Sequence, residues 1–128
     1  MAYAGIQTML LSYKMQKSDK EFELMQITNK RSQATKDSSA LSENYQAKKA
    51  ELKEQYAEDD PDYYNEAIDQ LDDDYNLDLA DIADWEDELQ QKESNCNTQI
   101  KLLDGYITTW TSALQNGIKN AHTYGAQQ

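Results

Sequence analysis

The chain is poor both in residues that interrupt helices and in residues that fill globular cores. It has one proline and no glycine between Gly5 and Gly105, so long stretches contain no strong helix breaker. It has no valine, and Leu, Ile and Phe make up only 20 of its 128 residues, too few for a conventional globular core. The single cysteine, Cys96, excludes an internal disulfide, and its place on an apolar stripe is typical of a small core residue.

The only proline predicts a turn in the middle of the chain. Pro61 lacks an amide hydrogen and ends an incoming helix, while its fixed φ suits the first position of a new one. Asp60, directly before it, is a good N-cap. We therefore expect an all-α fold, a long antiparallel helical hairpin (a coiled coil) in one domain. The expected parts are a first arm over about 4–57, a turn at 58–62, a second arm over about 61–120 and a tail at 121–128.

Apolar residues recur at helical spacing on both sides of this turn. In the second arm one heptad phase holds through Ile68, Tyr75, Ile82, Leu89, Cys96, Leu103, Trp110 and Gly117. In the first arm, steps of three and four run through Tyr3, Ile6, Leu10, Tyr13, Leu24, Ile27, Ala34, Leu41, Tyr45, Leu52 and Tyr56. Several Ser and Thr residues within 28–44 leave open whether the first arm is continuous.

Charge is segregated along the chain, whose net charge is −12. Residues 58–93 hold sixteen Asp and Glu and one basic residue, Lys92. The pattern predicts an exposed acidic face that includes Asp72, Asp73, Asp74, Asp81 and Asp84. Such a balance argues against a nucleic-acid partner, because phosphate contacts need a basic surface.

The sequence predicts no catalytic, metal or cofactor site, and we expect the protein not to be an enzyme. The acidic run from Asp72 to Asp78 lacks the glycine and the final acid of a calcium-binding EF-hand loop. His122 is the only histidine and has no partners that would suggest catalysis or metal binding. No stretch is long and apolar enough for a membrane span.

The two terminal zones are almost free of charge. Residues 1–13 carry none, and Lys119 is the only charge after Asp104. Helices this poor in charge are usually buried on most sides, either in a small bundle within the chain or between copies of it. We favour contact between copies. The predicted self-assembly interface contains Tyr3, Ile6, Leu10, Tyr13, Tyr106, Ile107, Trp110, Leu114 and Ile118.

The turn Asp59-Asp60-Pro61-Asp62, followed by Tyr63-Tyr64-Asn65-Glu66-Ala67, resembles the proline-containing turn of type III secretion needle and filament subunits. The uncharged termini also resemble the terminal coiled-coil zone of flagellins. The chain is longer than a needle subunit and lacks the second proline of the needle turn, so the resemblance is one of architecture. It implies that the terminal helices pack together in the core of a tube and that subunits are exported without a cleaved signal.

Two functions are therefore expected. The first is a structural subunit that assembles with copies of itself into an extracellular filament or tube with the acidic end outward. A secretion apparatus is a further candidate partner of this subunit. The uncharged residues 1–13 lack the positive region of a cleavable signal, which agrees with export by another route, although a cytoplasmic location is the alternative. The second function is a soluble acidic coiled-coil adaptor or chaperone that binds a basic protein.

Overall fold

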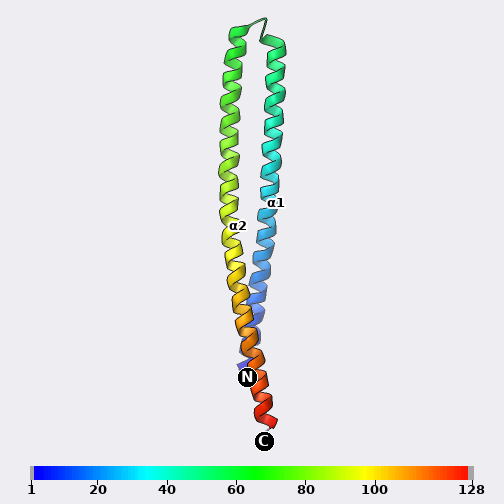
Figure 1. The fold of residues 1–128 in the computed structure, drawn as a ribbon, viewed down its shortest axis with the longest axis vertical. Helices are drawn as coiled ribbons and strands as arrows, with labels where there is room; N and C mark the ends of the chain where they lie inside the picture. The colour runs from blue at the N-terminus through cyan, green and yellow to red at the C-terminus, as the bar shows by residue number, and fades with distance from the viewer. Residues whose placement is uncertain (1, 127–128) are drawn as a thin grey trace. The chain divides into compact units, whose positions relative to one another are not determined.

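The computed structural model describes the backbone of residues 2–126 and the side chains of residues 3–120. Two helices, α1 (Ala2–Tyr56) and α2 (Pro61–Ala126), pack against each other as an antiparallel hairpin (Figure 1). This confirms the predicted fold class. The chain divides into two compact units: unit 1 comprises Met1–Ile27 and Lys92–Gln128, and unit 2 comprises Thr28–Gln91. Each unit therefore takes one segment from each helix.

The turn between the helices is built by Asp60 and Pro61, as the sequence predicts. The Asp60 amide donates to the Tyr56 carbonyl at 2.8 Å, which closes the end of α1. The Asp60 carboxylate then accepts a hydrogen bond from the Tyr63 amide at 3.2 Å, which caps the start of α2. Figure 1 shows the short connection between the cyan-green end of α1 and the green start of α2.

The Ser- and Thr-rich stretch does not interrupt α1, which is continuous from Ala2 to Tyr56. The Thr35 hydroxyl donates to the Arg31 carbonyl at 3.2 Å, so its polar group bonds within the helix instead of competing with it. Ala34 in the same stretch is fully buried, and Ser38 one turn later is half-buried. Packing through these small residues outweighs the weak helix propensity around them.

The predicted apolar stripes form the contact between the helices in both units. Every member of the α2 heptad phase is buried or half-buried, and so is every member of the α1 stripe. The most buried apolar side chains are Leu10, Ile27, Cys96 and Leu103 in unit 1, and Ala34 and Leu89 in unit 2. The second helix continues to Ala126, beyond the end expected near residue 120. The side chain of His122 lies outside the described part.

Candidate assembly surface

The predicted interface residues lie mostly along the seam between the two helices of unit 1. Leu10 is buried, and the half-buried members are Tyr3, Ile6, Tyr13, Ile107, Trp110 and Leu114. Tyr106 and Ile118 are exposed. The half-buried residues leave part of their surface in water, because a second helix covers only one side of each. Whether copies of the chain cover that remainder stays a prediction.

Aromatic residues join α1 to α2 near the chain termini. The Tyr3 hydroxyl donates to the Gly117 carbonyl at 2.6 Å. The Tyr3 ring lies so close to Gly117 that a Cβ placed on this glycine would come within 2.8 Å of Tyr3 Cε1. The absence of a side chain at position 117 is thus what lets the ring approach the helix. Farther along, the rings of Tyr13 and Tyr106 lie 5.4 Å apart between centroids.

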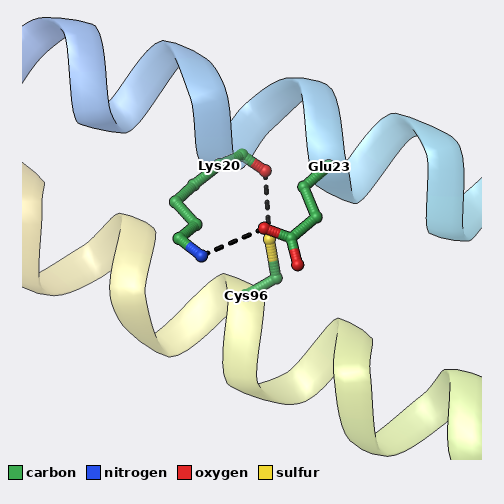
Figure 2. A network of polar contacts seen from close by, with 3 residues as sticks. All are labelled: Lys20, Glu23 and Cys96. Atoms are coloured by element: carbon green, nitrogen blue, oxygen red, sulfur yellow. Dashed lines mark hydrogen bonds and ion pairs between the residues drawn. The ribbon is translucent and has the colours of Figure 1, made fainter.

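Polar residues on the seam of unit 1 are hydrogen-bonded across it. Lys17 Nζ lies 2.6 Å from an Asp104 carboxylate oxygen, and this hydrogen bond raises the pKa of Lys17. Figure 2 shows the neighbouring group, where the Cys96 thiol donates to the Lys20 carbonyl at 3.0 Å and Lys20 Nζ donates to Glu23 at 3.0 Å. Burial first, and then the Glu23 charge, raise the pKa of the Cys96 thiol. A neutral, buried thiol is a poor nucleophile, as expected of a core cysteine.

Sequence reasoning missed a second apolar stripe on α1. Leu11, Met15, Phe22 and Met25 are all more than half exposed. They are spaced by four, seven and three residues, so they share one helix face, and we call them the outer stripe. Its residues alternate with those of the seam in sequence, as Leu11 follows Leu10, although the two stripes lie well apart around the helix. The spacing itself could have revealed it.

A groove runs along the side of unit 1 between the two helices. It encloses about 450 Å³ and is lined on α2 by Leu102, Leu103 and Tyr106. Asp19, Lys20 and Glu23 lie on its α1 side. Leu102 and Tyr106 are both exposed there. We call this the side groove.

Unit 2 presents the predicted acidic face. Asp73, Asp74, Asp81 and Asp84 are exposed. Asp72 differs from the prediction, because it is half-buried on the edge of the seam and accepts a hydrogen bond from the Tyr45 hydroxyl. The Tyr45 ring also stacks on Tyr75, with centroids 4.2 Å apart. The hydrogen bond to Asp72 raises the pKa of the Tyr45 phenol.

Neither a metal cluster nor a membrane-spanning helix is found among the described residues. No group of three or more His, Cys, Asp or Glu among them is placed to hold a metal ion. The described helices likewise include no stretch long and apolar enough to cross a membrane. No protein-family model, no curated protein and no solved structure matches the chain.

Proposed function

We propose that the chain is a structural subunit that assembles with copies of itself into a helical filament or tube. In this assembly unit 1 packs in the core, and the acidic unit 2 stays in solvent. One observation carries the proposal. Nine large apolar side chains are exposed among residues 3–120, and seven of them belong to unit 1. Exposed apolar side chains gathered in one region are typical of a surface that another protein covers.

The distribution of charge supports the same arrangement. Unit 1 has six basic and five acidic residues, whereas unit 2 has six basic and nineteen acidic ones. Copies that approached through unit 2 would repel each other, and copies that approached through unit 1 would not. An extracellular location rests on the resemblance to secreted filament subunits alone and stays a prediction.

Sedimentation velocity and negative-stain microscopy over a range of protein concentrations test this function. We expect a critical concentration, below which the chain is a small species and above which long particles of uniform width form. Added salt should lower this concentration, because it screens repulsion between the acidic units of neighbouring copies. A chain that stays monomeric and helical at high concentration, with or without salt, would exclude the filament.

The exposed carboxylates of unit 2 favour a second candidate, an adaptor or chaperone for a basic protein. The two functions differ in which residues they need. For an adaptor, Asp73→Ala with Asp81→Ala should abolish binding to a basic partner. For a filament, the same pair should assemble as the parent does or slightly better, since it removes repelling charge.

A further inference from the structure

We propose that the outer stripe of one copy docks into the side groove of the next copy, so that each subunit uses two different surfaces of unit 1. The inference rests on the proposed function and names the contact that would build the polymer. It starts from the outer stripe, where Leu11 is 60% and Phe22 is 57% exposed. The stripe passes through Ser18 and contains no charged position. At 3.6 residues per turn it lies roughly 150° around α1 from the seam, so α2 of the same copy does not cover it.

The side groove has the chemistry to receive such a stripe. Its α2 side offers Leu102, which is 53% exposed, and the ring of Tyr106. Its α1 side is formed by Asp19 and Glu23, which lie around the helix between the outer stripe and the seam. Two of the four stripe residues are methionines, whose unbranched side chains adapt to an irregular groove.

Charge identifies the occupant as a second copy. The groove is bordered by both signs, Lys20 against Asp19 and Glu23, and unit 1 as a whole is close to neutral. A strongly basic partner would be drawn to unit 2, with its nineteen acidic residues, and not to this region. Another copy of this acidic chain meets its least repulsion here.

The separation of the two surfaces determines the type of assembly. A stripe that paired with the same stripe of a second copy would close into a dimer and leave Leu102 and Tyr106 in water. A stripe that docks into a groove covers both surfaces with one kind of contact. Such a contact is heterologous, and it is propagated from copy to copy as an open chain when its rotation does not close a ring.

Two complementary variants test this contact. Phe22→Glu disables the stripe, and Leu102→Glu disables the groove, in each case at a side chain that the hairpin leaves more than half exposed. A carboxylate is costly in a dry contact, so each variant alone should need at least about tenfold more protein to polymerise than the parent. Leu77→Glu is the control: Leu77 is 66% exposed but lies in unit 2, and this variant should polymerise as the parent does.

Mixing the two variants gives the decisive result. The Phe22→Glu chain keeps an intact groove and the Leu102→Glu chain keeps an intact stripe, so together they should form a one-to-one heterodimer that does not grow. Circular dichroism of each variant checks that the helices are retained. Sedimentation equilibrium measures the stoichiometry of the mixture at ten times the critical concentration of the parent.

The other outcomes overturn the inference in different ways. Normal polymerisation of either variant, or a mixture that remains monomeric, excludes the stripe-to-groove contact while leaving the proposed function in place. A stable dimer of the Leu102→Glu chain by itself would show that stripes pair with each other. A parent chain that never polymerises would exclude the proposed function and the contact together.

Discussion

Unit 1 closes its seam with the buried Leu10, Ile27, Cys96 and Leu103, whereas unit 2 has only Ala34 and Leu89 at comparable burial. Unit 2 relies instead on half-buried aromatic residues, such as the stacked pair Tyr45 and Tyr75. The surfaces around the two seams also differ in chemistry. Unit 2 surrounds its seam with carboxylates, whereas unit 1 surrounds its seam with exposed Leu, Met, Phe and Tyr.

This contrast distinguishes the apolar residues that stabilise the hairpin from those that the hairpin leaves exposed. A two-helix contact buries one stripe on each helix, so any further apolar residue must stay in water or meet another chain. The seam of unit 2 lies beneath a surface of carboxylates that water solvates well. The seam of unit 1 lies beside exposed apolar side chains, which the proposed assembly would cover.

The largest expected effect comes from the small core of unit 2. Leu89 is 2% exposed, and Leu89→Ala should lower the free energy of unfolding by about 2–5 kcal/mol, through lost burial and the cavity that remains. Leu77→Ala, in the same unit at an exposed position, should change it by less than about 0.5 kcal/mol. Urea denaturation followed by tryptophan fluorescence measures both.

Each unit contains one tryptophan, so the two can be followed separately. Trp85 belongs to unit 2 and Trp110 to unit 1. In a Trp110→Phe background, fluorescence reports on unit 2 alone. Leu89→Ala should lower the urea concentration at the midpoint of the Trp85 transition at least as much as that of the Trp110 transition. A larger shift at Trp110 would mean that Leu89 supports unit 1 more than its own unit.

The next largest effect distinguishes two glycines of α2 in unit 1. A Cβ at Gly105 meets nothing within 4 Å, so Gly105→Ala should stabilise the helix by about 0.5–1 kcal/mol. At Gly117 the same Cβ would come within 2.8 Å of the Tyr3 ring, which must move and give up its hydrogen bond. Gly117→Ala should therefore give no net gain, because the lost bond, worth about 0.5–1.5 kcal/mol, offsets the improved helix propensity.

Removing the Tyr3 ring should restore the gain. In a Tyr3→Ala background Gly117→Ala should raise the melting temperature as much as Gly105→Ala does. If Gly117→Ala stabilises the parent and the Tyr3→Ala chain equally, Tyr3 does not restrict position 117.

Features that depend on local backbone chemistry or helical period could be predicted from the sequence, whereas features that depend on contacts between the helices could not. Pro61 and Asp60 determine the turn through their own backbone chemistry, so it was predictable to within a residue or two. The heptad phase of α2 was predictable because burial follows helical period. The continuity of α1 through 28–44 was not predictable, because it depends on packing at Ala34 that outweighs the weak helix propensity of the residues around it. The outer stripe was missed because the seam residues alone already account for a helix in this part of the chain. Asp72 was expected to be exposed, because its partner Tyr45 lies on the other helix and the sequence does not show that they meet.

A smaller effect should separate the units by charge. Raising the salt from 0.1 M to 1 M shortens the screening length from about 10 Å to about 3 Å. Repulsion among the nineteen acidic residues of unit 2 should weaken, whereas unit 1, with nearly balanced charge, should respond little. We expect salt to stabilise the Trp85 transition more than the Trp110 transition, by several tenths of a kcal/mol. Asp73→Asn with Asp81→Asn should reduce the stabilisation of unit 2 by salt. If salt stabilised both units equally, the difference in charge between them would not affect their stability.

The smallest expected effect concerns the bond between Tyr45 and Asp72, a polar link across the unit 2 seam. Because this hydrogen bond raises the pKa of Tyr45 above its ordinary value of 10.0, the folded chain favours the protonated phenol. The stabilisation is therefore complete below pH 10 and is lost as the pH rises through the raised pKa, where a tyrosinate would face the Asp72 carboxylate.

Tyr45→Phe removes the titrating group and keeps the ring beside Tyr75. Thermal melts between pH 8 and about pH 11 should show the parent more stable than Tyr45→Phe at the lower end, with the difference shrinking as the pH rises. Two parallel pH curves would mean that the bond to Asp72 contributes nothing to folding.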